Sequence, residues 1–450
     1  MAGLRRARDA WNRYWFRPAP AIDLDVLRIA AVGFQLVLLW GADWWWGPMP
    51  AHLARTAALP DFFYNPIGVL FVYSELGGPR PTLGPVLAIY GLTWVAGVLA
   101  LIGWFTRPAM AVFAAGSVLI VTFYYSFTDF HHVESLLLIT LLLLAWAPVG
   151  RTLSVDALRA RLRHNIGERR FEPWDQAGVT DLYAAWPVHL VRVLFALVYL
   201  SACVTKLNLD GGGLFRWANG STLQYWMIQD SYFFSSQVAL WFSQLPLPVL
   251  AVASWGALAF EGTFWTAAVW PRLAAFYVPA GVAFHLGIFA TQRAAFFPYY
   301  ALYACFLPAR RLLLAARERI TADRPLVLYD AACLLCLRSM TILQFLDWFD
   351  RIAYVPLQQD PLPRLGRVDA AFRHRALEQM HVVERDGSLH AGFAACRRLA
   401  WRLPLAWPIV PFLYLPGATM IGSFAYRRVA ETRERFETCD GDACMLHRRR

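Results

Sequence analysis

Long apolar runs recur through roughly the first 310 residues, and they limit what this chain can fold into more than any other feature. A helix needs about 20 apolar residues to cross the hydrocarbon core of a bilayer. Of the 450 residues, 58% are hydrophobic and 16% are charged, whereas about a quarter are charged in an ordinary soluble protein. This composition excludes an intrinsically disordered chain. It predicts a polytopic α-helical membrane domain of about eight spans, within a range of six to nine, near residues 24–46, 82–105, 109–127, 133–149, 188–204, 248–270, 274–291 and 294–308.

Basic residues are concentrated in alternate loops between these runs, and this asymmetry predicts the orientation of the chain. They cluster in the leader, in residues 151–170 and in residues 310–319, whereas the alternate loops hold few of them. Because cytoplasmic loops carry the excess of Arg and Lys, we predict a multi-pass protein of the cell inner or plasma membrane with both termini in the cytoplasm. The first run has no small-residue cleavage site, so we interpret it as a retained span. Loop charge of this kind argues against a nucleic-acid partner.

Beyond about Thr321 the long apolar runs give way to short strand-like and helical segments. Strand patterns occupy residues 325–330, 352–357 and 380–392, the last with a hairpin at Asp386-Gly387, and residues 339–349 have helical spacing. The β–α–β order predicts a small α/β domain in the cytoplasm. We therefore predict two domains, a membrane domain at 1–320 and a small α/β domain at 321–450.

One later segment, residues 404–425, is apolar but contains four prolines. Proline removes a backbone N–H and breaks long helices. We interpret this segment as a packed or interfacial helical pair, and the alternative is a ninth span.

Two cysteines three residues apart, Cys333 and Cys336, follow the first predicted strand and begin the next helix. The free N–H groups of a helix N-terminus stabilise a thiolate. This pattern predicts Cys333 as a nucleophile and Cys336 as the resolving thiol. Two alternatives are a zinc site completed by Cys439, Cys444 and His447, and a pair of buried cysteines with no redox role. We favour the dithiol and predict no metal.

The stretch LVLYDAACLLCLRSM, at residues 326–340, resembles the signature of the DCC family of thioredoxin-like thiol-disulfide oxidoreductases. Further matching pieces are YVPLQ at 354–358, the stretch 386–392 and YRRVAETRERF at 426–436. The resemblance covers about residues 324–437 and implies an active-site set of Asp330, Cys333 and Cys336. Ala331 departs from the glycine that is common in the family.

Lys206 is the only lysine among 42 basic residues, and the predicted topology places it at the outer end of the fifth span. An amine in a partly dehydrated site can act as a base, whereas a guanidinium stays charged. The topology places His131, His132, His285 and Glu261 on the same side, and ionisable residues in membrane segments are functional candidates. The alternatives are a snorkelling cation and hydrogen-bonded interfacial histidines.

Residues 10–310 resemble the HTTM group, the membrane domain shared with vitamin K-dependent γ-carboxylase. The pieces that carry this resemblance, in order, are DLDVLRIAAVGFQLVL, GWFTRPAMAV, FHHVESLLL, YLSACVTKLN, AFEGTFW and FHLGIFATQRAAFFPYYALYACFLP. The resemblance implies that Lys206 deprotonates a reduced, vitamin K-like quinone, assisted by His132, or by His131 if the register slips by one. Cys203 and Thr205 depart from the family pattern. The loops at 47–81 and 205–247 are too short for the large extracytoplasmic domain of the carboxylase.

Two classes of function follow from these features. The first is an integral-membrane redox enzyme that joins a quinol-using, carboxylase-like membrane domain to a dithiol oxidoreductase, with membrane lipid or quinone and a peptide or protein thiol as partners. The second is a non-enzymatic membrane factor for export, immunity or peptide maturation with a redox-active tail. A third reading, in which the membrane part only anchors the dithiol domain, is less favoured because eight spans exceed what an anchor needs.

Overall fold

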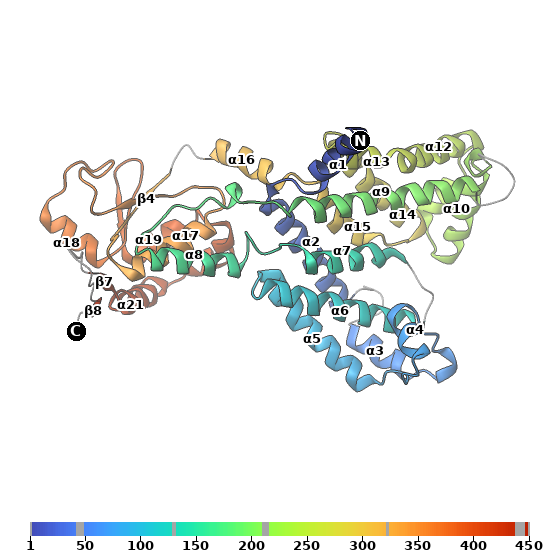
Figure 1. The fold of residues 1–450 in the computed structure, drawn as a ribbon, viewed down its shortest axis with the longest axis horizontal. Helices are drawn as coiled ribbons and strands as arrows, with labels where there is room; N and C mark the ends of the chain where they lie inside the picture. Colours follow the sequence, from blue (N-terminus) through green and yellow to red (C-terminus); the bar gives the residue numbers. More distant parts are fainter. Residues whose placement is uncertain are drawn as a thin grey trace. The chain divides into compact units, whose positions relative to one another are not determined.

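A computed structural model describes residues 2–41, 49–127, 132–208, 216–320, 324–436 and 446–448. The chain divides into two compact units (Figure 1). Unit 1 comprises residues 1–151 and 180–308, and unit 2 comprises residues 152–179 and 309–450. The predicted boundary after residue 320 differs from this division in two ways. Residues 309–320 belong to unit 2, and so does a segment from the loop after the fourth predicted span.

Unit 1 is helical, and five of its described helical segments are long and apolar enough to cross a membrane. They are α5 (Leu83–Ile102), α6 (Thr106–Tyr125), α9 (Ala185–Asn208), α12 (Leu247–Thr263) continued by α13 (Trp265–Val269), and α14 (Ala274–Gln292). A helix satisfies its own backbone hydrogen bonds, which a spanning segment in lipid requires. The chain therefore has the character of a membrane protein.

The predicted number of about eight spans is not confirmed, because three predicted spans correspond to different structures. The run at 133–149 forms α7 (Ser135–Trp146), whose 12 residues extend only about 18 Å. The run at 294–308 forms the short helices α15 (Phe297–Leu302) and η5 (Tyr303–Phe306). The run at 24–46 corresponds to α2 (Ala21–Gly41), which is not among the five, and its last five residues lie outside the described part of the chain.

Helix α2 carries a buried ion pair in unit 1. The Arg28 guanidinium lies 3.1 Å from the Asp25 carboxylate, and both side chains are almost fully buried. Arg28 also donates to the carbonyl oxygens of Ala100 and Leu101 at the end of α5, and the backbone N–H of Gly150 donates to Asp25. Buried charges are tolerated when they are paired and hydrogen-bonded, and this network ties α2 to α5.

The remaining elements of unit 1 are α1 (Ala2–Trp15), α3 (Met49–Ala57), η1 (Asp61–Phe63), α4 (Gly68–Glu75), η2 (His132–Glu134), η4 (Trp217–Asn219), α10 (Ser221–Phe233) and α11 (Gln237–Ser243). Two short strands, β1 (Ala19–Pro20) and β2 (Thr180–Asp181), pair antiparallel. The unit is held by one large core of apolar side chains from α2, α5, α6, α7, α9 and the segment 296–306.

Unit 2 is built on a four-stranded sheet in the order β4-β3-β5-β6. Its strands are β3 (Leu326–Tyr329), β4 (Ala353–Pro356), β5 (His381–Val383) and β6 (Leu389–Ala391). Strand β3 runs parallel to β4 and antiparallel to β5, and all four of its residues are buried. A continuous apolar run that is buried on both faces is typical of a central strand. The helices α17 (Leu334–Leu346), α18 (Ala370–Glu378) and α19 (Gly392–Ala400) complete this fold.

The segment 152–179 packs on α17 rather than forming a free loop. It contains α8 (Val155–Gly167) and η3 (Gln176–Gly178), and Figure 1 shows α8 beside α17. The Asn165 amide donates to the Thr341 hydroxyl at 2.8 Å, and the Gln176 amide donates to the carbonyl of Phe345 at 2.8 Å. Phe171 lies in the same apolar core as Cys333. Unit 2 is thus assembled from two distant parts of the sequence.

The proline-containing segment forms a helical hairpin in unit 2. It comprises η6 (Pro404–Ile409), α20 (Val410–Leu413) and α21 (Ala418–Ala430). Its two arms are bent by 120° at the break, so it is not one straight helix. Unit 2 also contains α16 (Ala309–Ile320), β7 (Glu434–Phe436) and β8 (Leu446–Arg448), and the last two pair antiparallel.

Candidate dithiol site

The two cysteines lie at the junction of β3 and α17, as the sequence predicts. Cys333 occupies the N-cap position of α17, and its Sγ accepts a hydrogen bond from the backbone N–H of Cys336 at 3.4 Å. The Cys333 N–H donates to the Asp330 carbonyl at 3.2 Å. Both thiols belong to the core of unit 2, with exposed fractions of 1% for Cys333 and 8% for Cys336.

The surroundings make the two thiols unequal acids. A hydrogen bond from the Cys336 thiol is the main cause that lowers the pKa of Cys333 from 9.0 to about 7. The Cys336 backbone N–H and the positive charge of Arg433 act in the same direction, against the effects of burial and of Asp330. The same thiol–thiol hydrogen bond, with burial, raises the pKa of Cys336. A low-pKa thiol beside a high-pKa thiol is the arrangement expected of a nucleophile and its resolving partner.

Asp330 holds the loop between β3 and α17 through its side chain. Its Oδ1 accepts hydrogen bonds from the Ala332 N–H at 3.1 Å and from the Gln358 amide at 2.8 Å. Gln358 in turn accepts from the Ala331 N–H at 3.1 Å. Ala331 therefore fits a loop whose shape is held by these two side chains, and its backbone N–H is used.

Strand β7 covers this loop, which the sequence did not predict. Arg435 forms an isolated antiparallel bridge with Cys333, and the Phe436 N–H donates to the Ala332 carbonyl at 2.7 Å. The Arg435 guanidinium lies 2.8 Å from the buried Asp330 carboxylate. The motif at 426–436 belongs to the resemblance to the DCC family, but nothing local in it indicates that it lies on the dithiol.

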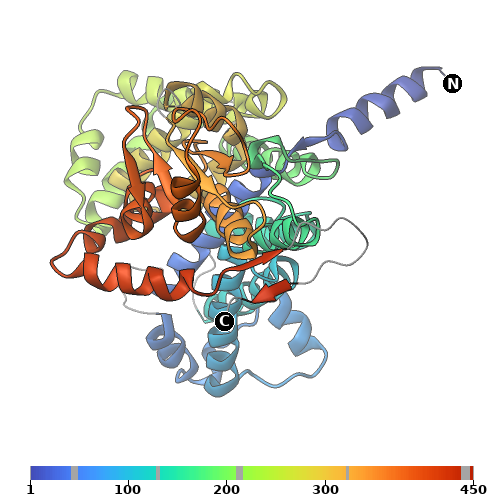
Figure 2. The same cartoon turned by 90° about the vertical axis from the view of Figure 1, so that its left-hand side faces the viewer.

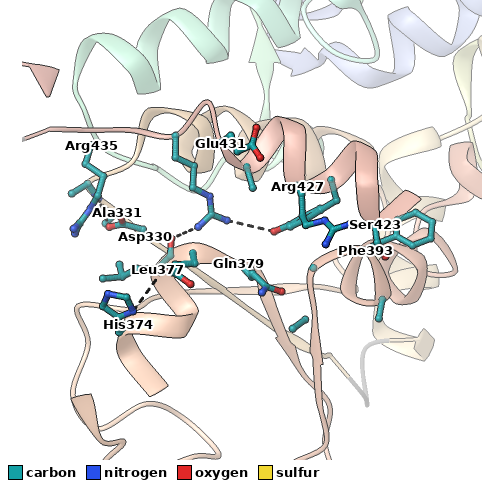
Figure 3. A pocket seen from close by; sticks show the side chains of 18 of the residues that line it. Asp330, Ala331, His374, Leu377, Gln379, Phe393, Ser423, Arg427, Glu431 and Arg435 are labelled. Carbon is teal, nitrogen blue, oxygen red and sulfur yellow. Dashed lines mark hydrogen bonds and ion pairs between the residues drawn. The ribbon is translucent and has the colours of Figure 1, made fainter. Parts of the chain in front are cut away.

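Two cavities adjoin the site. A broad groove of about 1620 Å³ lies over the dithiol loop. Figure 3 shows Asp330 and Arg435 toward one end of it and Phe393 and Arg427 toward the other. A second, mostly apolar cavity of about 530 Å³ has Cys336 in its wall, with side chains of α17, α19 and α21 around it. The resolving thiol thus faces an apolar space.

The other candidate ligands do not form a described metal site. Cys439 and Cys444 lie outside the described residues, and the side chain of His447 does as well. In the part of the chain that the structure describes, no group of three or more His, Cys, Asp or Glu could hold a metal ion. Cys396, on α19, is not bonded to another cysteine, and burial raises its pKa to about 11. It is therefore a poor nucleophile beside Cys333.

In unit 1 the structure brings together two of the predicted residues. Lys206 on α9 donates from Nζ to both carboxylate oxygens of Glu261 on α12, each at 2.7 Å. Glu261 is buried, the Lys206 side chain is a quarter exposed, and Nζ lies 5.6 Å from the centre of the Trp217 ring. His131 lies outside the described residues, and the structure does not describe the side chain of His132.

His285, on α14, belongs to a different group of contacts. Its Nε2 lies 3.3 Å from the Tyr199 hydroxyl, which lies 2.7 Å from the Tyr303 hydroxyl. The imidazole is stacked with the rings of Tyr199 and Phe296. His285 is thus a buried, hydrogen-bonded histidine that does not contact the Lys206–Glu261 pair directly.

Comparison with known proteins supports the C-terminal part of these predictions. Residues 327–438 match the family model described as DCC1-like thiol-disulfide oxidoreductase. No curated protein and no solved structure matches the chain. The match covers about a quarter of the sequence, including both cysteines of the dithiol. The similarity of residues 10–310 to the HTTM group stays a prediction.

Proposed function

We propose that this protein is an integral-membrane thiol-disulfide oxidoreductase in which Cys333 is the nucleophile and Cys336 the resolving thiol. The observation that carries the proposal is the position of Cys333 at the N-cap of α17, where the hydrogen bonds from Cys336 lower its pKa to about 7. At pH 7 such a thiol is about half ionised, whereas an unperturbed thiol is only a few per cent ionised. The thioredoxin-like character of unit 2 belongs to the same proposal, supported by the β–α–β–α–β–β–α order of the sheet.

The proposed reaction is a two-step exchange. The Cys333 thiolate attacks one sulfur of a substrate disulfide, so that a mixed disulfide forms and the other substrate sulfur leaves as a thiolate. Cys336 then loses its proton and attacks the Cys333 sulfur, which releases the second substrate thiolate. The dithiol is oxidised by two electrons and the substrate disulfide is reduced by two. Reversal of both steps oxidises a substrate dithiol. Asp330 acts as a positioning residue for the loop.

Trapping of the mixed disulfide tests this assignment. When the full chain carrying Cys336→Ser is treated with glutathione disulfide, a mixed disulfide between Cys333 and glutathione should accumulate, because the resolving thiol is missing. Cys333→Ser should not form one at Cys336, and Cys396→Ser should behave as the parent protein. Peptide mass spectrometry identifies the modified residue. Equal trapping at 336 and 333, or none in Cys336→Ser, would overturn the proposed roles.

We also propose that unit 2 lies in the cytoplasm, on the argument from the basic loops. A reporter fusion at residue 320 tests this orientation. An extracytoplasmic signal at that position would place the dithiol in an oxidising compartment, where disulfides form and persist, and would contradict this orientation.

For unit 1, the HTTM resemblance implies a reaction with a reduced quinone in which Lys206 is the base. Substitution of Lys206 tests this proposal. Nζ is held by both oxygens of Glu261, and this ion pair requires an ammonium, whereas a base requires a neutral amine. The pair as found does not fit a quinol base. Lys206→Arg separates the two roles because arginine preserves the charge but cannot serve as a base. Full quinol-dependent oxygen uptake in Lys206→Arg would exclude Lys206 as the base.

The non-enzymatic alternative, a factor for export, immunity or peptide maturation, makes a different prediction. There the Lys206–Glu261 pair only joins α9 to α12, and purified protein shows no quinol-dependent oxygen uptake. Lys206→Ala would then lower stability, while Lys206→Arg would leave the phenotype intact.

A further inference from the structure

The helical hairpin of unit 2, defined here as residues 404–430, exposes apolar side chains along both of its arms. At least half of the surface of each of the following side chains is exposed: Leu405, Trp407, Ile409, Phe412, Leu415, Met420, Ile421, Phe424 and Val429. Soluble surfaces rarely keep so many large apolar side chains contiguous, and such patches mark interaction sites. Figure 2 shows α21, in red, along the edge of unit 2.

The hairpin is nevertheless firmly attached to unit 2 through its other face. Val410 is buried, the Tyr426 hydroxyl accepts a hydrogen bond from the Met380 N–H at 2.7 Å, and Gly422 lies directly against the ring of Phe393. The exposed apolar face is therefore a property of the folded unit and not of a loose segment.

The charges around this face are mostly positive, although Glu384 pairs with Arg398 and Arg402, and Glu431 pairs with Arg428. Residues 392–430 contain five arginines, at 397, 398, 402, 427 and 428, and no aspartate or glutamate. Arginines near a membrane surface are attracted to anionic lipids. The hairpin region also carries Trp401, Trp407 and Tyr414, and the indole N–H of Trp401 donates to the Tyr414 hydroxyl at 3.0 Å. Trp and Tyr are the residues enriched at membrane interfaces.

The shape of the hairpin favours lying in the interface over spanning it. Its arms, Pro404–Leu413 and Ala418–Ala430, are bent by 120° relative to one another and extend roughly 15 and 20 Å at 1.5 Å per residue. Each is shorter than the hydrocarbon core of about 30 Å. Helices with an apolar face and a basic rim bind in the plane of the membrane surface.

We propose that the hairpin inserts its apolar face into the surface of an anionic bilayer and holds unit 2 there. The five apolar helices of the same chain make a bilayer available to unit 2. Gly422, Ala425 and Tyr426 of α21 also form a wall of the apolar cavity that contains Cys336. The dithiol therefore lies directly behind the membrane-binding face and acts on substrates at the membrane surface. The bilayer contact itself does not depend on the proposed redox function.

Fluorescence quenching by brominated lipids tests the contact in the full chain. A fluorescent amino acid replaces Ile421, which is 66% exposed on α21, or Leu389, which is 44% exposed on β6. The protein is reconstituted in vesicles of phosphatidylcholine and phosphatidylglycerol that carry bromine on the acyl chains. We expect quenching at position 421 and none at position 389.

Quenching by aqueous iodide shows whether water or protein covers this face in place of lipid. Quenching of position 421 by iodide, without quenching by brominated lipid, would show that the face stays in water and would overturn the proposal. Protection from both quenchers would mean that protein covers the face, either unit 1 or a second copy, and would overturn it equally.

Two variants test whether positive charge and the apolar face hold the hairpin on the bilayer. Arg427→Gln with Arg428→Gln should lower the docked-to-free ratio about fivefold for each arginine lost, and the loss should be smaller at high salt. Phe424→Asp should reduce lipid quenching at 421 even in anionic vesicles. Since all three side chains are exposed, thermal unfolding of unit 2 should change little, which serves as the folding control. Unchanged lipid quenching in both variants would show that neither charge nor the apolar face holds the hairpin on lipid.

Discussion

Release of β7 from the dithiol loop should make Cys333 reactive, and Phe436→Pro is the substitution that tests this most directly. Cys333 is only 1% exposed, although its pKa of about 7 favours the thiolate. The hydrogen bond from the Phe436 N–H to the Ala332 carbonyl, 2.7 Å long, helps to keep β7 over the loop. Proline has no backbone N–H, so this bond is lost while the rest of the chain is unchanged.

The magnitude follows from the value of one hydrogen bond. A net contribution of about 0.5–1.5 kcal/mol corresponds to roughly a 2- to 12-fold change in the population of the open form. When opening is fast compared with the chemical step, the reaction rate follows that population. The rate of Cys333 alkylation by iodoacetamide should therefore rise by about 2- to 12-fold in Phe436→Pro, measured by peptide mass spectrometry with the Cys396 peptide as internal reference.

The matched control is Phe436→Leu, which keeps the N–H and removes the ring that lies 5.6 Å from the Arg169 guanidinium. The pH profile separates exposure from acidity. Below pH 7 the Cys333 thiol is protonated and unreactive, so the rate should rise with pH and level off above 7. Phe436→Pro should raise the plateau without moving the midpoint, whereas Cys336→Ala should move the midpoint upward. An alkylation rate in Phe436→Pro equal to that of the parent protein would refute the idea that the Phe436 hydrogen bond holds β7 over the dithiol loop. An equal increase of the rate in Phe436→Pro and Phe436→Leu would refute it as well.

Three further predictions concern stability. Burial raises the pKa of Asp347 to about 6 from 3.8, so its contribution to stability falls as pH rises from about 4 to 6. Asp347→Asn should abolish this slope in urea denaturation, at the cost of one of the two hydrogen bonds that the carboxylate accepts from the Arg351 and Ile352 N–H groups. A Cβ at Gly116 would lie 2.0 Å from the Thr93 hydroxyl, whereas one at Gly91 meets nothing within 4 Å. Gly116→Ala should therefore lower the melting temperature of unit 1 in detergent, by about 1–3 kcal/mol in stability, and Gly91→Ala should not. Asn165→Ala should cost unit 2 about 1–3 kcal/mol and speed proteolysis within residues 152–179.

The parts of this structure that local sequence determines could be predicted. The apolar run of β3, the two cysteines after it and the helical spacing of α17 all act within a few residues of one another, and they form the predicted strand, cap and helix. The hairpin at Asp386-Gly387 is of the same kind, since it joins β5 to β6. These elements can be predicted without knowledge of contacts between distant residues.

Contacts between distant residues explain what could not be predicted. The arginine-rich α8 looks like a membrane-flanking loop, because its attachment to unit 2 depends on Asn165 and a hydroxyl 176 residues away. The cover over Cys333 depends on an equally remote strand. The sequence identifies both Lys206 and Glu261 as candidates. Their contact could not be predicted, because it depends on how α9 and α12 are rotated about their own axes.

The lengths of the helices in unit 1 show a different limit. Residues 133–149 are apolar apart from Glu134, Ser135 and Thr140, yet α7 ends at Trp146. Pro148 follows, and the residue before a proline is pushed out of the helical region. Accordingly Ala147 adopts an extended conformation. Counting apolar residues therefore overestimates the helix when a proline lies near its end.

The assembly of unit 2 constrains how often the chain crosses the membrane. Because residues 152–179 fold together with residues 309–436, the two ends of the segment 180–308 lie on the same face, and that segment must cross an even number of times. It contains three of the five long apolar helices, α9, α12 with α13, and α14, so these three cannot be its complete set of crossings. Either one of them does not cross or another segment completes a fourth.

The short helices α15 and η5 do not supply that crossing by themselves, because residues 297–306 extend only about 15 Å at 1.5 Å per residue. Tyr299, Leu302 and Cys305 are instead almost fully buried in the core of unit 1. The pairing of β1 with β2 sets the same condition on the first half of unit 1, since it brings residue 19 beside residue 181. Helices α5 and α6 already satisfy it, and α2 and α7 must then cross together or not at all. Five crossings made by the five long apolar helices alone therefore do not meet both conditions.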